Sequence, residues 1–340
     1  MGVIAGLDVG GAHLKVALVA DGTPVEVRQI LCPLWQGMDK LDAALVEAAP
    51  LLRRATRFAV TMTGELSDLF EDRADGVARL IARLVAELGP AALYWAGRRG
   101  FADAEAARLL AADVGSTNFL ATATLVAERA RDGLLVDMGS TTTDIIAFRD
   151  GRPVVRGLTD GERLESGELV YTGLTRTAIM AVASRIPLRG RWQGMVREHY
   201  ATMADVRRVL GELADGLDLH ATADGRGKSV EESVARLARM LGRDAADGTP
   251  DEWRAAARFL ADRQQEHIAD GCRQVMSATA GSNDQAIVAA GIGADAVASL
   301  ARRLCCGSIT FGELTGATGG AAIAATHCAP AVAVALLAGA

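Results

Sequence analysis

Two stretches of the chain repeat one pattern of apolar and polar positions. In the first, the apolar run 3–7 precedes a polar, glycine-containing turn that begins at Asp8, and a second apolar run follows the turn. In the second, the apolar run 134–136 precedes a turn of the same kind that begins at Asp137. Short apolar runs on both sides of a polar turn predict a β-hairpin. Two such hairpins far apart in the chain indicate a duplicated architecture.

The segments between and after the hairpins alternate between helical and extended patterns. Apolar residues recur at helical spacing over 75–88, and Ser229 with Glu232 forms a capping box at the start of another helix. We expect Asp251 to cap a helix that runs to about residue 269. Further helices are expected over 39–49, 104–112 and 295–304, and further strands over 25–30, 57–61, 91–96, 286–290 and 308–311. Strands and helices mixed in this order predict an α/β protein.

Length and composition indicate the domain organisation. The chain has 340 residues, of which 50% are hydrophobic and 23% are charged, so it can bury the cores of about two domains. We expect one domain over 1–125 and a second, related domain over 126–340. The stretch at about 174–272 is helical and rich in charge, so we expect it to be an insertion in the second domain.

The net charge indicates which class of molecule the protein binds, and the cysteines indicate the cellular compartment. The net charge is -6 and no basic stripe marks a nucleic-acid surface, so small molecules are the expected substrates. The five cysteines lack CxxC spacing, which favours reduced thiols in a cytoplasm. The uncharged tail 317–340 is rich in alanine and is interrupted by Pro330, which favours a buried terminal helix over a membrane span. The composition does not determine the oligomeric state, so the sequence is compatible with a homodimer.

The first polar turn carries the residue types of a phosphate-binding loop. Gly10 and Gly11 would let backbone N–H groups approach an anion without a Cβ in the way. Asp8 offers the oxygen ligand that Mg²⁺ prefers, and Lys15 on the returning strand would add a point charge to the same phosphate. Taken alone, the segment is equally consistent with an ordinary glycine turn and a solvated lysine.

The second polar turn repeats these features and adds hydroxyl groups. Asp137 and Gly139 repeat the Asp-x-Gly arrangement, and Asp144 places another carboxylate on the returning strand. A run of hydroxyl side chains that could donate to phosphate oxygens lies between them, including Ser140, Thr141 and Thr142. The alternative is a polar hairpin with ordinary Ser/Thr turns. If the two turns face each other across a cleft, they form a polyphosphate clamp, with Asp8 and Asp137 as ligands of Mg²⁺.

Two further segments carry candidate residues. Gly291 and Gly293 stand between a predicted strand and a predicted helix, in a GxGxxA pattern. Too little chain follows for a complete dinucleotide-binding unit, so we expect the helix N-terminus there to contact an anion or a nucleoside. Glu65 follows the strand 57–61, and polar groups at strand ends line clefts in α/β folds. Glu65 or Asp68 would therefore act as a base or a ligand, unless the segment caps a helix.

The paired Asp-x-Gly hairpins and the late Gly-x-Gly segment resemble the actin, Hsc70 and sugar-kinase superfamily. This resemblance implies an α/β fold of two ribonuclease-H-like domains around a central phosphate-binding cleft. It also implies that the two hairpin loops and the segment with Gly291 and Gly293 flank a nucleotide.

Five segments resemble a narrower group, the hydantoinase/oxoprolinase-like proteins linked to tetrahydromethanopterin-dependent C1 metabolism. These segments are 6–15, 61–66, 136–144, 157–164 and 167–173. Characterised archaeal members join γ-glutamyltyramine to an aminomethylfuran-methyl diphosphate during methanofuran biosynthesis. The resemblance therefore implies a transferase that forms an aryl ether and releases diphosphate. Ser116 to Phe119 depart from the pattern, because an Asn-Trp pair is expected there.

The resemblance also implies roles for residues within the cleft. Mg²⁺, backbone N–H groups, Lys15 and the Ser/Thr run would stabilise the departing diphosphate. The acceptor phenol, with a pKa of about 10, would need a base such as Asp144 or Glu65, or positioning alone. Glu162 and Arg163 would bind the γ-glutamyl or amine groups, although a surface salt bridge explains Arg163 equally well. The rival functions are an ATP-dependent small-molecule kinase, an oxoprolinase-like amidohydrolase and a nucleotide-binding protein without turnover.

Overall fold

The computed structural model describes residues 2–279 and 286–340, and its first domain is built on a six-stranded mixed sheet. Strands β1 to β3 form antiparallel hairpins, and β4 and β5 run parallel to β1, in the order β3-β2-β1-β4-β5-β6. The bounds are β1 (Ile4–Val9), β2 (His13–Ala20), β3 (Thr23–Leu31), β4 (Arg57–Met62), β5 (Leu93–Trp95) and β6 (Phe101–Ala102). Every residue of β1 is buried, as expected for a central strand covered on both faces. The first predicted hairpin is confirmed.

The second domain repeats this strand order. β7 and β8 form its antiparallel hairpin, β13 and β14 run parallel to β7, and β9 and β10 both pair with β8. The bounds are β7 (Gly133–Met138), β8 (Thr143–Arg149), β9 (Arg152–Val154), β10 (Leu169–Val170), β13 (Ile287–Ala290) and β14 (Ser308–Thr310). The duplicated architecture is confirmed, and the α/β fold consists of two ribonuclease-H-like domains of the actin, Hsc70 and sugar-kinase type.

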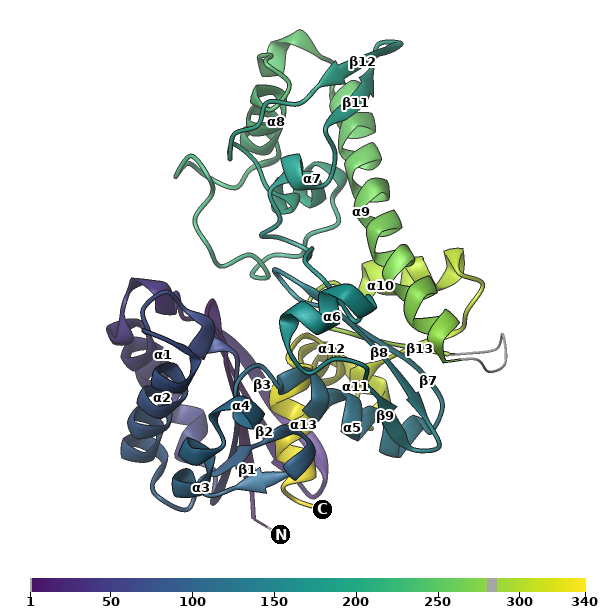
Figure 1. Ribbon diagram of the computed structural model, residues 1–340. Coiled ribbons are helices and arrows are strands. Elements are labelled where there is room, and N and C mark those ends of the chain that lie inside the picture. Colours follow the sequence, from purple (N-terminus) through teal and green to yellow (C-terminus); the bar gives the residue numbers. More distant parts are fainter. Residues whose placement is uncertain (1, 280–285) are drawn as a thin grey trace.

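Helices cover both faces of the first sheet. α1 to α4 pack on one face, where α2 presents the apolar stripe predicted over 75–88. α5 and α13 pack on the other face, between the two sheets (Figure 1). The bounds are α1 (Met38–Leu52), α2 (Arg73–Leu88), α3 (Ala104–Leu109), α4 (Ala111–Val114), α5 (Asn118–Ala130) and α13 (Ala329–Leu337). The C-terminal helix therefore contributes to the core of the first domain, far from its position in the sequence.

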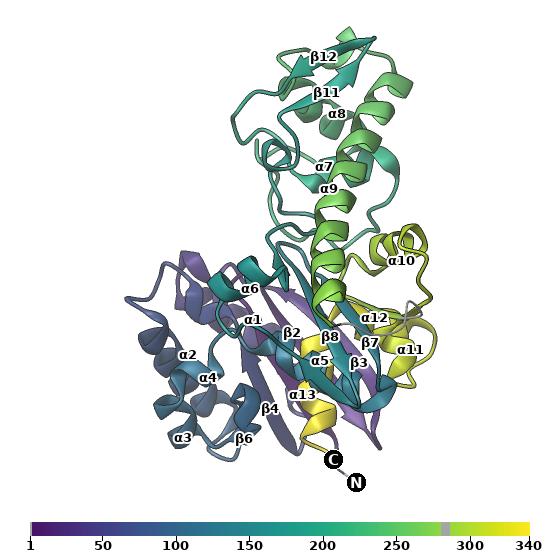
Figure 2. The same ribbon diagram turned by 45° about the vertical axis from the view of Figure 1, so that its right-hand side comes forward.

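A lobe from the second half of the chain extends away from both sheets (Figures 1 and 2). It has an apolar core of its own, to which the N-terminal half of α9 contributes, while the C-terminal half of α9 packs on the second sheet. Its elements are β11 (Arg185–Leu188), β12 (Arg191–Gly194), α7 (Met203–Leu210), α8 (Val230–Arg239) and α9 (Pro250–Ala278). The capping box at Ser229 is confirmed. The prediction for α9 was wrong at both ends, because Thr249 is its N-cap and the helix runs beyond residue 269.

The remaining helices connect these parts. They are α6 (Asp160–Ser166), α10 (Ala294–Arg303), α11 (Phe311–Leu314), α12 (Gly319–His327) and short 3₁₀ turns at Leu34–Gln36, Gly64–Leu66, Gly97–Arg99, Ile179–Ala181 and Ala245–Asp247. Within the described part of the chain, no single helix has the length and apolar character to cross a membrane. Only α12 and α13 together reach that length and composition, and they meet at a bend of 99°. α13 is buried over nearly its whole length, but the prediction of one buried helix over the apolar tail is confirmed only in part, because the tail forms two helices and α12 is mostly half-buried or exposed.

Candidate active site

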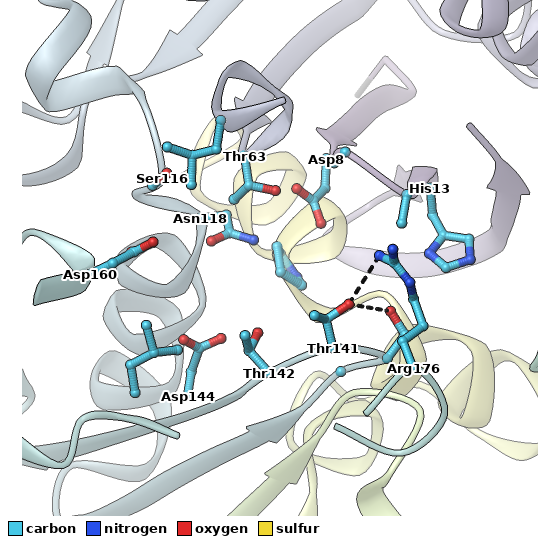
Figure 3. Close-up of a pocket in the computed structure, with 18 of the residues that line it drawn as sticks. Asp8, His13, Thr63, Ser116, Asn118, Thr141, Thr142, Asp144, Asp160 and Arg176 are labelled. Atoms are coloured by element: carbon cyan, nitrogen blue, oxygen red, sulfur yellow. Dashed lines mark hydrogen bonds between the residues drawn. The ribbon is translucent and has the colours of Figure 1, made fainter. Parts of the chain in front are cut away.

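A cavity of about 600 Å³ lies where the two hairpin loops face each other (Figure 3). Residues from both domains line it. Most of the predicted site residues are among them: Asp8, Gly10, Gly11, Lys15, Asp137, Gly139, Ser140, Thr141, Thr142, Asp144 and Arg163. The structure thus brings the two predicted loops together in one cleft.

The β1–β2 hairpin determines the geometry of the first loop. Asp8 and Lys15 are cross-strand partners, and Lys15 Nζ lies 3.3 Å from Asp8 Oδ2. Burial alone would lower the pKa of Lys15, but the Asp8 carboxylate raises it above the ordinary value, so the ammonium stays charged. The Gly10 N–H donates to the His13 carbonyl at 3.0 Å and closes the turn. A cation is therefore held in the cleft beside a buried carboxylate.

The β7–β8 hairpin holds the second loop in the same way. Asp137 and Asp144 are cross-strand partners. Burial and the nearby Asp144 carboxylate raise the pKa of Asp137 to about 7. The Gly139 N–H donates to the Thr142 carbonyl at 2.9 Å, which leaves the hydroxyl groups of this loop on the cavity wall. The loop therefore presents hydroxyl donors beside two carboxylates.

Asp8 and Asp137, which were predicted as ligands of Mg²⁺, are two of the carboxylates that line the cavity. Asp8 Oδ1 is buried and has no hydrogen-bond partner among the described residues, and the buried Asp137 carboxylate would be stabilised by a further positive charge. Over 2–279 and 286–340, no three His, Cys, Asp or Glu side chains are grouped so that they could hold a metal ion by themselves. Mg²⁺ commonly takes one or two protein carboxylates together with substrate phosphates and water. The donor set therefore fits Mg²⁺ that binds with a phosphate-containing substrate.

Arg163 forms a buried ion pair at the edge of the cavity. Its side chain is 3% exposed, and Nη2 donates to Asp144 Oδ1 at 2.6 Å and to the Glu168 carbonyl at 3.1 Å. The guanidinium carbon lies 3.6 Å from the centroid of the Phe119 ring, within the range of a cation–π contact. The alternative prediction of a salt bridge is confirmed for the pairing but not for its surface location, because the Arg163 side chain is buried. Arg163 orients Asp144 at the cavity wall.

Four predicted site residues do not line this cavity: Glu65, Glu162, Gly291 and Gly293. The Glu162 carboxylate accepts two backbone N–H groups at the start of α6 and completes a capping box there. Gly291 supports the second loop, because a Cβ at this position would lie 2.4 Å from Asp137 Oδ1 and its φ of 79° favours glycine. Gly293 lines a neighbouring cavity of about 920 Å³ at the N-terminus of α10. Contact of Glu162 with substrate, and of both glycines with a cofactor, stays a prediction.

Glu65 lies directly behind the cavity wall. It is 1% exposed, and its Oε1 accepts a hydrogen bond of 2.5 Å from the Ser116 hydroxyl, which lines the cavity. Burial raises the pKa of Glu65 to about 7, although the hydrogen bond from Ser116 opposes the rise. Glu65 does not cap α2, whose N-cap is Asp72. A carboxyl group that titrates near neutral pH therefore reaches the cavity through a hydroxyl group.

Glu65→Gln is expected to change the pH dependence of stability. The folded chain keeps the Glu65 proton up to a pH of about 7, whereas the unfolded chain releases it near the ordinary pKa of 4.5. Stability is therefore lost as the pH rises through this window. The variant lacks this loss, so its unfolding free energy relative to wild type should rise by roughly 2–4 kcal/mol across the window. Urea unfolding on both sides of the window measures the change, and an unchanged difference would contradict the assignment.

A cluster of residues with no local motif lies at one end of the cavity, and it includes one residue of the lobe, His220. Arg176 Nη1 donates to Thr141 Oγ1 at 3.2 Å (dashed in Figure 3), and its guanidinium lies over the Trp35 ring. His220, from a long loop of the lobe, stacks on Trp35 and meets the His13 ring edge-on. Burial lowers the pKa of His13 to about 3 and that of His220 to about 4, so both rings are neutral. Sequence reasoning missed this cluster, because its members meet only through the tertiary fold.

Polar side chains gather at the other end of the cavity, and of these sequence reasoning named only Asp68 as a candidate base or ligand. They are Thr63, Ser67, Asp68, Ser116, Asn118 and Asp160. Asn118 begins α5, and its side-chain oxygen accepts the Phe119 N–H at 2.8 Å, so the amide nitrogen is directed toward the cavity (Figure 3). The departure from an expected Asn-Trp pair at this position was the available sequence signal.

Known proteins similar to this chain identify its family. The hydantoinase/oxoprolinase family model matches residues 57–331. The chain is 33% identical over 251 residues, 74% of its length and 74% of the relative, to "(4-{4-[2-(gamma-L-glutamylamino)ethyl]phenoxymethyl}furan-2-yl)methanamine synthase" from Methanocaldococcus jannaschii. The protein of the same name from Methanococcus vannielii is 34% identical over 119 residues, which cover 35% of this chain and 53% of that protein.

Among solved structures, nucleotide-free acetone carboxylase has a TM-score of 0.57 at 13% identity, over 89% of this chain and 67% of that chain. This likeness supports the fold alone. The family model and the archaeal relative agree with the two facing loops in assigning the chain to one group. The chain belongs to the hydantoinase/oxoprolinase family and is a relative of the archaeal furan methanamine synthases.

Proposed function

We propose that this chain forms an aryl ether between the phenol of γ-glutamyltyramine, or of a tyrosine analogue, and an aminomethylfuran-methyl diphosphate, with release of diphosphate. The observation that carries the proposal is the 33% identity over 74% of the chain to the M. jannaschii synthase. The name of that relative describes a furan methanamine joined to a phenol through a methylene ether. This chain would thus be a transferase of methanofuran biosynthesis.

The geometry of the cleft supports diphosphate as the leaving group. The bond between the furanylmethyl carbon and the diphosphate oxygen breaks, and the electron pair stays with the diphosphate. The Lys15 ammonium and the donors of both loops border the cavity, so they can stabilise the charge that develops on that oxygen. The furan ring shares the positive charge of the methylene carbon, which the phenol oxygen then attacks.

Mg²⁺ is the cofactor in this proposal, and its removal should stop the reaction. Asp8 and Asp137 would hold the ion, which supplies further positive charge against the diphosphate when it is bound. Treatment with EDTA should reduce diphosphate release to background, and added Mg²⁺ should restore it. Full activity after removal of divalent cations would contradict the metal assignment. The proposal includes small-molecule substrates and a cytoplasmic location.

Mass spectrometry of reactions with and without ATP tests the proposed function. The reactions contain the chain, γ-glutamyltyramine, the aminomethylfuran-methyl diphosphate and Mg²⁺, and a parallel series contains the tyrosine analogue. We expect the ether and an equimolar amount of diphosphate without ATP. ADP without the ether would instead indicate a kinase or an oxoprolinase-like amidohydrolase. Nucleotide binding without any product would indicate a non-catalytic protein.

A further inference from the structure

A serine and a buried glutamate form a hydrogen-bonded pair in the wall of the cavity. Ser116 follows α4 and lines the cavity, and its hydroxyl donates to Glu65 Oε1 at 2.5 Å. The other carboxyl oxygen, Glu65 Oε2, is buried and has no hydrogen-bond partner in the described part of the chain. A molecule in the cavity can therefore exchange a proton with the buried carboxyl group through Ser116.

The surrounding backbone holds this pair in place. Ser116 has a φ of 56°, a left-handed conformation that is strained for serine, and its N–H donates to the Met62 carbonyl at 3.2 Å. Two glycines make room for Glu65. A Cβ on Gly76 would lie 2.7 Å from the Glu65 carbonyl oxygen, and a Cβ on Gly115 would lie 2.9 Å from Oε1. Strain that is retained at a cavity wall, beside a closely packed carboxyl group, points to a functional arrangement.

The surroundings of Glu65 shift the pKa of its carboxyl group in both directions. Burial is the largest effect and raises the pKa to about 7. The Ser116 hydroxyl and the Arg73 guanidinium, at the start of α2, lower the pKa, whereas the Asp160 carboxylate, at the start of α6, raises it. A base with a pKa close to the working pH is well matched to proton transfer.

Asp144, the other predicted base, is already paired with Arg163. Asp144 Oδ1 accepts from Arg163 at 2.6 Å, and that guanidinium lies against the Phe119 ring. In Figure 3, Ser116 and Asp144 lie on opposite sides of the cavity, and Asp144 is on the side of the phosphate-binding hydroxyls. Ser116 therefore borders the space that faces the second loop, where an attacking oxygen would approach the carbon opposite the diphosphate.

We propose, building on the proposed function, that Ser116 is a catalytic residue that receives the phenolic proton of the acceptor and that Glu65 acts through it. As the phenol oxygen bonds to the methylene carbon, its proton moves to Ser116 Oγ, and the Ser116 hydroxyl proton moves to Glu65 Oε1. The electron pair of the broken C–O bond leaves with the diphosphate. The products are the neutral ether, the diphosphate and a protonated Glu65, which later releases its proton to solvent.

Acceptors of different acidity test this proton route. Glu65→Gln and Ser116→Ala should each lower kcat with γ-glutamyltyramine by about 10²–10⁴-fold, the usual contribution of general base catalysis. The acidic limb of the wild-type pH profile, near pH 7, should be absent from both variants. A γ-glutamyl derivative of a fluorinated tyramine, whose phenol ionises more readily, should recover most of the lost rate. A residue with only a structural role would not respond to acceptor acidity.

Two further variants control for folding and for backbone strain. Ser116→Gly removes the hydroxyl and relieves the left-handed strain, so it should be as slow as Ser116→Ala and at least as stable. Thr124→Ala removes a hydroxyl from α5 that donates only to the Leu120 carbonyl, and it should keep wild-type activity. If wild type forms the ether, normal turnover of Ser116→Gly would overturn the proton route but not the proposed function. A lack of recovery with the fluorinated acceptor would do the same. A wild type that forms no ether would overturn the proposed function and this route with it.

Discussion

Lys15→Ala is expected to lower kcat for ether formation by about 10³-fold or more, because it removes a fixed cation from the place where the diphosphate gains charge. The Lys15 ammonium lies 3.3 Å from Asp8 Oδ2, and the Lys15 side chain is only 20% exposed. The ion pair therefore holds the ammonium in place before any substrate binds. Interactions that are fixed in advance contribute most in the transition state, where the negative charge is greatest. The rate of diphosphate release under saturating substrates measures the effect.

A matched set of variants separates this catalytic effect from a folding effect. Lys15→Ala leaves the buried Asp8 carboxylate without its cation, which destabilises the folded chain. Combining it with Asp8→Asn removes that charge, so the double variant should regain stability but stay inactive. Lys40→Ala is the control, because Lys40 pairs with the adjacent Asp39 at the solvent-exposed start of α1. Normal turnover in the double variant would contradict the assignment of Lys15 and Asp8 to the phosphate clamp.

The sequence predicted the parts of the fold and the site that depend on the residue pattern within a single hairpin or helix. Each hairpin brings its own aspartate, glycines and returning strand together, so the Asp8–Lys15 and Asp137–Asp144 pairs follow from strand register alone. The facing arrangement of the two loops could be predicted only once the duplication was noticed. The strand order of the two sheets confirms the duplication, and residues of both loops line one cavity. Local turn chemistry therefore predicted the half of the cavity wall that the two loops form.

The parts that could not be predicted depend on contacts between distant segments. α13 carries no charged residue and packs beside β1, a contact that its composition permits but does not specify. His220 reaches His13 and Trp35 only because the lobe extends a loop to the first domain. The role of Ser116 depends on Glu65, which is distant in sequence and is connected to it by one hydrogen bond. Helical or strand periodicity contains no information about such pairs.

Gly173→Ala is expected to lower kcat/KM by about 10²-fold or more, because a misplacement of about 1 Å in a catalytic loop has an effect of this size. A Cβ at Gly173 would lie 2.5 Å from the Ser140 carbonyl carbon and 2.5 Å from the Thr141 nitrogen. Gly173 cannot move away easily, because its N–H donates to Thr177 Oγ1 at 2.9 Å and its carbonyl accepts from Gln264 at 2.7 Å. The second loop must therefore shift instead.

The cause of that loss can be distinguished from general destabilisation. Overpacking of this kind costs about 1–3 kcal/mol, so the variant should fold with a lowered Tm and be assayed well below it. Gly194→Ala is the matched control, because a Cβ there meets no atom within 4 Å, and it should leave kcat/KM unchanged. A shifted loop should raise KM for the diphosphate substrate more than KM for the phenol, because in the proposed function the hydroxyl groups of the loop hold the phosphates. Equal changes in both KM values would indicate that the second loop does not hold the diphosphate.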